Sequence, residues 1–247
     1  MNGKELLIVL AFGIATFALG YLLALPTEPE LIRLEPLPEK EFTAMIDVVA
    51  VKVQREVGIV NVASVEVKPG KGRVLFALNP FVEPDTQQSA EIAASVAENI
   101  TQKSLAEKDV IYSIEAGEVQ LVGGPSAGAA LTIATIAAIE EKDLNESVGL
   151  TGSILSDGSI GQVGGIIEKA AAVEQSGKTI FLVPPGQTSF TYYEKQIREE
   201  TRGPFVFQRV NYVPKTLELN EFAREQEWNL NIIEVNSIEE ALLYFLS

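Results

Sequence analysis

A serine in a glycine-rich segment is the residue of this chain best placed to do covalent chemistry. Residues 123–128 read GGPSAG and precede a long apolar run, so Ser126 stands at a predicted helix start. The chain has no histidine and no cysteine, so an imidazole, the usual base for a nucleophilic serine, is absent. If Ser126 acts as a nucleophile, a lysine or a carboxylate must take its proton.

The same segment offers donors for a developing negative charge. Gly123 and Gly124 permit close approach of a substrate backbone, and Pro125 presets φ for a first helical turn. Backbone N–H groups at a helix start, here those of Gly124 and Ser126, can stabilise an oxyanion. The simpler interpretation is that these residues only cap a buried helix, and the segment by itself leaves both open.

Lys169, in GGIIEKAAAVEQSG, is the candidate base. It falls on the apolar stripe of a predicted helix together with Ile166, Ala170 and Val173. Complete burial lowers the pKa of an ammonium by as much as about 3–5 units, which leaves a neutral amine able to accept a proton. The alternative is that Lys169 extends past its alanine neighbours into solvent.

Composition limits the classes of function. The chain has 247 residues, of which 47% are hydrophobic, which suits a substantial buried core. Its 34 acidic and 19 basic residues give a net charge of −15, so nucleic acid is not an expected partner. Without histidine or cysteine a transition-metal site is disfavoured, and we expect neither a metal nor a cofactor.

The first residues predict a membrane anchor and a stalk. After a short tail at 1–5, residues 6–25 carry no charge and match the length of one transmembrane helix. Residues 26–41 are rich in proline and glutamate and suit an extended stalk, and a folded domain is expected over 42–247. A cleaved signal peptide is the alternative, although Leu22 stands where its cleavage site prefers a small residue.

Charges around the predicted span suggest its orientation. Lys4 precedes it, whereas Glu28 and Glu30 follow it. The excess of positive charge on the cytoplasmic side of membrane proteins then favours a folded domain outside the cytoplasm. The expectation is a single-pass membrane protein with the lipid bilayer as a partner.

Strand and helix patterns alternate irregularly along the folded part, which predicts an α+β domain. An amphipathic helix is expected within 85–108, and a helix over 127–139 is apolar on every side and should be buried. The segment at about 187–228 is aromatic and irregular, and we expect its aromatic side chains to pack a local subcore. The alternative is that they line a substrate groove or a subunit contact.

The two candidate residues and the chain between them resemble a known family. GGPSAG, followed 43 positions after its serine by the lysine of GGIIEKA, resembles the proteolytic domain of Lon proteases. The block GLTGSILSDGSIGQVGGIIEKAAAVEQSGKTIFLVP is similar to the family's Thr-Gly strand, hairpin, lysine helix and following strand. The resemblance implies that Ser126 is the nucleophile, that Lys169 is the general base and that Thr151 holds the lysine amine. It also implies a hexameric ring.

Four features depart from the family pattern. Many members have an acid three residues before the nucleophile, where this chain has Gly123, and the glutamate that often follows Thr-Gly is Ser153 here. The segment at about 187–228 is longer than in typical members. No GxxxxGK[ST] loop of an ATPase module occurs in the sequence. The arrangement resembles a stand-alone archaeal Lon-type serine protease with an N-terminal membrane anchor.

The predicted function is an ATP-independent serine endopeptidase that cleaves unfolded polypeptides through an acyl-enzyme. One alternative is a membrane-tethered scaffold of the same fold that has lost activity, with which Gly123 is consistent. Another is a small-molecule kinase, because glycine-rich loops at helix starts also bind phosphate. Activity that depends on Ser126 distinguishes an enzyme from a scaffold, and ATP binding distinguishes a kinase from a protease.

Overall fold

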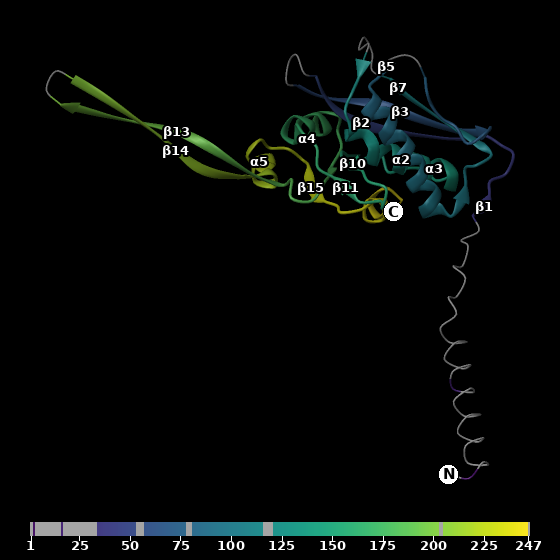
Figure 1. Ribbon diagram of the computed structural model, residues 1–247. Helices are drawn as coiled ribbons and strands as arrows, with labels where there is room; N and C mark the ends of the chain where they lie inside the picture. Colours follow the sequence, from purple (N-terminus) through teal and green to yellow (C-terminus); the bar gives the residue numbers. More distant parts are fainter. Residues whose placement is uncertain are drawn as a thin grey trace. The chain divides into compact units, whose positions relative to one another are not determined.

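The structure is a computed structural model that describes residues 2, 16, 34–52, 57–77, 81–115, 121–202 and 205–246. The chain divides into two compact units, Met1–Arg33 and Leu34–Ser247, and every element named below belongs to the second. Helices and strands are mixed, as the α+β prediction requires (Figure 1). The helices are α2 (Pro84–Thr101), α3 (Gly128–Glu140), α4 (Ile166–Gln175), α5 (Leu219–Glu225) and α6 (Ile238–Phe245).

Four strands form the largest sheet, in the order β2-β3-β7-β4. Its neighbours are antiparallel except for β4 and β7, which are parallel. A second sheet of three parallel strands has the order β15-β12-β9. The strands of these two sheets are β2 (Phe42–Lys52), β3 (Val57–Pro69), β4 (Val74–Phe76), β7 (Lys108–Glu115), β9 (Val148–Leu150), β12 (Ile180–Val183) and β15 (Asn231–Glu234).

The remaining strands pair two by two. They are β1 (Glu35–Pro36) with β6 (Lys103–Ser104), β5 (Phe81–Val82) with β8 (Leu121–Val122), β10 (Ser153–Ile154) with β11 (Ile160–Gly161), and β13 (Ser189–Arg202) with β14 (Phe205–Glu218). Because β1 already pairs with β6, the folded unit begins at Leu34 rather than at the predicted residue 42. Pro36 is compatible with such an edge strand because an edge position needs no backbone N–H.

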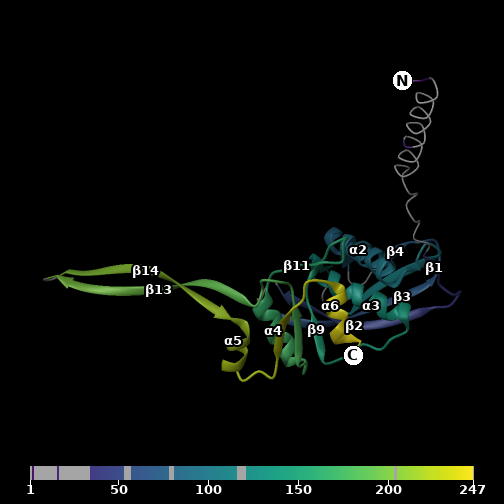
Figure 2. The same cartoon turned by 90° about the horizontal axis from the view of Figure 1, so that it is seen from below.

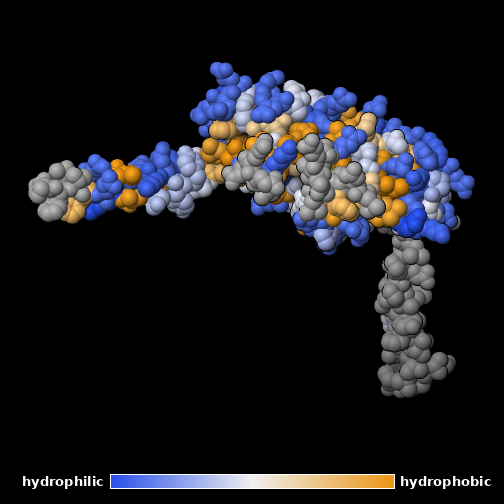
Figure 3. Space-filling view, turned by 90° about the horizontal axis from the view of Figure 1, so that it is seen from above, coloured by the Kyte–Doolittle hydropathy of each residue, from blue (hydrophilic) through white to orange (hydrophobic). Residues whose placement is uncertain are grey.

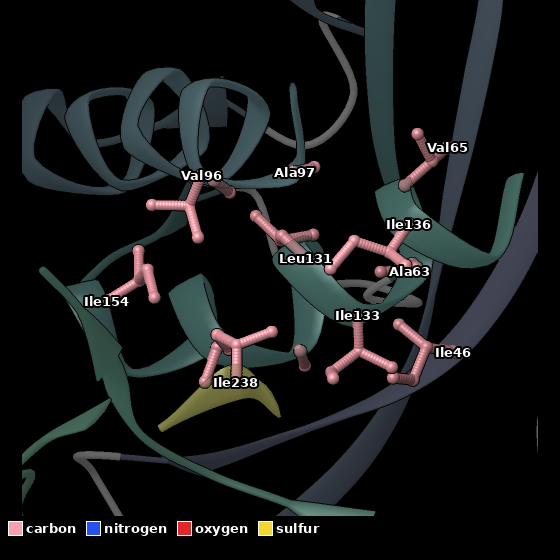
Figure 4. Packing of buried hydrophobic residues seen from close by; sticks show 14 of the residues in the cluster. Ile46, Ala63, Val65, Val96, Ala97, Leu131, Ile133, Ile136, Ile154 and Ile238 are labelled. Carbon is pink, nitrogen blue, oxygen red and sulfur yellow. The ribbon is translucent and has the colours of Figure 1, made fainter. Parts of the chain in front are cut away.

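Helix α3 is the centre of the main core. Every residue from Gly128 to Ile139 is buried, which agrees with the prediction from its uniformly apolar sequence. Figure 4 shows Leu131 and Ile133 of this helix among side chains of α2, β2 and β3. Its threonines donate their hydroxyls to carbonyls four residues earlier, so no polar side-chain atom of this helix is left buried and unpaired.

Helix α4, which carries Lys169, packs closely on β3 at a glycine. A Cβ built on Gly58 would lie 1.9 Å from the carbonyl oxygen of Glu168, far inside van der Waals contact. Any larger residue at position 58 would therefore push α4 away from the sheet. The buried side chains of α4 form a second core cluster with residues of β12, α5 and β15.

The segment at 187–228 contains long regular strands. Strands β13 and β14 pair residue by residue from Ser189 with Glu218 to Arg202 with Phe205, and helix α5 follows. Figures 1 and 2 show this hairpin extending away from the other elements. Most of its aromatic side chains are exposed instead of packing a subcore, with Tyr193 67% and Tyr212 64% exposed. Phe190 at the base of the hairpin packs against the second cluster, as do Phe222 and Trp228 at the end of the segment.

The expected membrane location is corrected by the structure. Crossing a bilayer core takes about 20 consecutive apolar residues in one helix. Among the residues that the structure describes, no helix is long and apolar enough to do so. The longest, α2, has 18 residues and carries charged side chains. The predicted span at 6–25 lies, except for Thr16, outside the described residues, as does the stalk before residue 34.

Candidate active site

Ser126 lies in a single 3-10 turn, Pro125–Ala127 (η1), which leads directly into α3. Gly124, the residue before this turn, has φ of 93°, a conformation that glycine adopts without strain. Ser126 itself is half-buried, whereas the first residues of α3 are buried. The motif therefore places a partly accessible serine where the chain enters the core.

A buried threonine and a buried lysine lie next to each other at this site. Thr151 directly follows β9, and Lys169 lies in the first turn of α4. The amine of Lys169 donates to Thr151 Oγ1 at 3.1 Å. Thr151 is fully buried and Lys169 is 3% exposed, so the lysine does not extend into solvent.

The Thr151–Gly152 segment connects this pair to the serine. The Thr151 hydroxyl donates to the carbonyl oxygen of Ser126 at 3.4 Å. The N–H of Gly152 donates to the same carbonyl at 3.1 Å, and the N–H of Ala129 donates to the carbonyl of Gly152 at 3.1 Å. One hydroxyl can accept from an amine and donate to a carbonyl at once, so Thr151 bridges Lys169 and the Ser126 backbone.

Burial shifts the ionisation of the lysine. Desolvation lowers the pKa of the Lys169 ammonium from 10.5 to about 8. Burial is thus what makes the neutral amine easier to reach. A substantial fraction of neutral amine is therefore present slightly above neutral pH, which a general base requires.

Two groups with predicted catalytic roles, the Lys169 amine and the Gly124 N–H, make hydrogen bonds to other residues. Among the hydrogen bonds of the described residues, none joins the Ser126 hydroxyl to the Lys169 amine, whose hydrogen bond goes to Thr151. The N–H of Gly124, a predicted oxyanion donor, donates to Asp85 Oδ1 at 3.3 Å. Catalytic hydrogen bonds are often long or unformed before substrate binds, so the geometry is compatible with either role.

The start of α2 contributes residues that the sequence did not indicate. Asp85 accepts from the Gly124 N–H, and the hydroxyl of Thr86 donates to the Gly124 carbonyl at 3.2 Å. The side chain of Glu83 lies against Gly123. The pattern of Glu-Pro-Asp-Thr predicts a helix start, and nothing in it shows that the side chains face a segment about 40 residues away.

In the part of the chain that the structure describes, no group of three or more acidic side chains could hold a metal ion. The site thus consists of a half-buried serine at a helix start, a buried threonine and a buried lysine, set in an α+β domain. Residues 56–220 match the family model described as the Lon protease (S16) C-terminal proteolytic domain. The chain belongs to this family.

Curated relatives agree with this assignment. The chain is 31% identical over 138 residues to a Lon protease of Phenylobacterium zucineum, which covers 54% of this chain and 17% of the relative. It is 27% identical over 156 residues to a Lon protease of Dictyoglomus thermophilum, 61% of this chain and 19% of the relative. A Lon protease 1 of Bdellovibrio bacteriovorus is 31% identical over 159 residues, 62% of this chain and 20% of the relative. The matches span at most a fifth of these relatives.

Proposed function

We propose that this protein is a serine-type endopeptidase in which Ser126 is the nucleophile and Lys169 the general base. The observation that carries the proposal is the buried Lys169, whose pKa is lowered to about 8. Its amine donates a hydrogen bond to the Thr151 hydroxyl, which in turn donates to the Ser126 carbonyl. A lysine in this setting supplies the base that a chain without histidine needs. Thr151 orients the amine and does not itself react.

The reaction proceeds by acyl transfer. Ser126 Oγ attacks the carbonyl carbon of a peptide bond while its proton passes to the neutral amine of Lys169. Backbone N–H groups of the turn η1 that leads into α3, including that of Ser126, stabilise the oxyanion, and that of Gly124 joins them once it leaves Asp85. The ammonium returns the proton to the departing amine, leaving an ester on Ser126. Water, deprotonated by the same lysine, then hydrolyses the ester and restores both residues.

Unfolded polypeptides and peptides are the proposed substrates. A peptide bond must reach a half-buried serine in an extended form, which a folded protein does not present. We propose that these residues cut such substrates without ATP, because the sequence holds no GxxxxGK[ST] phosphate-binding loop.

We also propose that the protein forms a homo-oligomer, with the hexameric ring of the family resemblance as the expected form. One face of the β13–β14 hairpin supports association. The pairs Tyr193 with Pro214, Lys195 with Tyr212 and Ile197 with Val210 put mostly apolar side chains on that face. Ile197 is 51% exposed, and Figure 3 shows hydrophobic patches on the hairpin. The mass of the full chain in solution tests this proposal, with a mass of one chain as the contradicting result.

An inactive scaffold of the same fold is the second candidate. The missing hydrogen bond between Ser126 and Lys169 and the engaged N–H of Gly124 favour it. The two candidates differ in whether the chain cleaves anything at all.

Hydrolysis of a fluorescently labelled unfolded protein by the full chain, without ATP, tests the proposal. Ser126→Ala and Lys169→Ala are expected to lose cleavage with folding intact. The matched control is Ser156→Ala, which changes an exposed serine in the turn between β10 and β11 and should leave the rate unchanged. Cleavage that survives in Ser126→Ala would overturn the site, and no cleavage by the unmutated chain would favour the scaffold.

A further inference from the structure

The carboxylate of Glu83 occupies the space where a side chain at position 123 would begin. A Cβ built on Gly123 would lie 2.1 Å from Glu83 Oε2 and 2.4 Å from its carboxyl carbon. Gly123 is not among the glycines with positive φ, so its φ does not require a glycine. The glycine at 123 is therefore explained by the space that Glu83 fills and not by backbone conformation.

Glu83 is turned away from its own helix. It is the N-cap residue of α2, with extended φ and ψ of −71° and 158°, yet its side chain makes no capping hydrogen bond. Short polar and acidic side chains at this position commonly accept from the first N–H groups of the helix. Here the carboxylate reaches across to another segment, the one that leads into Ser126.

The neighbours of Glu83 hold the same segment. Asp85 accepts from the Gly124 N–H at 3.3 Å, and Thr86 donates to the Gly124 carbonyl at 3.2 Å. Together with Glu83 they contact both residues before Pro125. The start of α2 thus holds the backbone of Gly123 and Gly124, which lie three and two residues before Ser126.

We propose that Glu83 is a positioning residue whose carboxylate, reaching from the start of α2, holds the segment that leads into Ser126. It fixes the Gly123–Gly124 segment and, through it, the orientation of Ser126 and of the backbone N–H groups around it. Small displacements of such groups cost large factors in rate, so the effect is expected in kcat more than in KM. The inference rests on the proposed peptidase function.

Moving the carboxylate from position 83 to position 123 tests the inference. The test uses four proteins: the unmutated chain, Glu83→Ala, Gly123→Asp and the double variant. Glu83→Ala should lower kcat about tenfold because the segment loses its support. Gly123→Asp should also lower kcat at least about tenfold, because its new side chain meets Glu83 and places two carboxylates together. The double variant should recover to within about threefold of the unmutated chain, since one carboxylate then remains in that space.

Glu91→Ala, which removes an exposed acid further along α2, is the matched control and should change kcat by less than about twofold. A double variant no better than the poorer single variant would overturn the inference, as would full activity of Glu83→Ala. If the unmutated chain cleaves nothing, the proposed function fails separately. The same four proteins in denaturant unfolding then test the contact, because Gly123→Asp should destabilise only while Glu83 is present.

Discussion

Residues 148–183 and residues 189–218 follow each other in the chain, but they differ in how much of the rest of the fold packs against them. The first stretch runs from β9 to β12. These two strands lie in a three-stranded sheet with β15, and α4 between them packs on β3. The second is the β13–β14 hairpin, whose strands pair only with each other. Chemistry that needs a desolvated lysine at a fixed position is possible only in the first stretch, whereas the hairpin offers exposed surface for contacts.

A methyl group at Gly58 should have the largest effect on folding. Its Cβ would lie 1.9 Å from the Glu168 carbonyl, so Gly58→Ala must shift α4 and Lys169 with it. We expect a loss of about 2–4 kcal/mol in the free energy of unfolding and a loss of cleavage of about 100-fold. Denaturant unfolding and the cleavage assay measure both.

Gly164→Ala is the control for this change, since a Cβ there meets nothing within 4 Å and α4 follows two residues later. It should leave both quantities nearly unchanged. Equal effects of the two substitutions would show that close packing of α4 is not what positions the site.

The free energy of unfolding should change in opposite directions when each of two buried lysines is replaced by methionine. Lys169 is buried and forms no ion pair with any described residue, so Lys169→Met should abolish cleavage and raise the free energy of unfolding by about 1–3 kcal/mol at neutral pH. Lys178 is also buried, but its amine pairs with the Asp47 carboxylate at 2.7 Å. Lys178→Met should therefore lower the free energy of unfolding by about 2 kcal/mol. Denaturant unfolding of both variants measures the difference.

The stabilisation in Lys169→Met should depend on pH. The cost of a buried ammonium is fully present below about pH 8 and disappears as the pH rises toward 10.5, where the lysine of the unfolded chain also loses its proton. A gain that stays constant across this range would contradict the lowered pKa.

Cleavage itself should follow the neutral form of Lys169. Below its pKa the rate should increase about tenfold per pH unit, and it should level off above about pH 8. The rate of peptide hydrolysis over a range in which the fold is stable measures this profile. A rate independent of pH through this range would argue against a lysine base.

The smallest effect on folding is expected on the hairpin. Ile197 is 51% exposed, so Ile197→Thr should change the free energy of unfolding of the single chain by less than about 0.5 kcal/mol. Phe190, at the base of the same strand, packs against the second core cluster, and Phe190→Ala should cost about 2 kcal/mol. A large effect at Ile197 would mean that the hairpin face is already covered within one chain.

The sequence was informative where one local pattern determines the structure. The uniformly apolar run after Ser126 predicted a buried helix, and the apolar stripe around Lys169 predicted a buried lysine. The hairpin was missed because charged residues, Pro214 and aromatic side chains interrupt the alternation typical of a half-buried strand. The contact between Glu83 and Gly123 was missed because it joins segments distant in sequence, and no local pattern reports such a contact.

The central claim is that Ser126 forms a covalent acyl intermediate with the help of Lys169. Incubating the full chain with a peptide ester and measuring the mass of the intact protein and of its fragments tests this claim most directly. We predict one acyl group on the fragment that contains Ser126, absent in Ser126→Ala and strongly reduced in Lys169→Ala. Hydrolysis without any adduct in all three proteins, or an adduct on another residue, would contradict it.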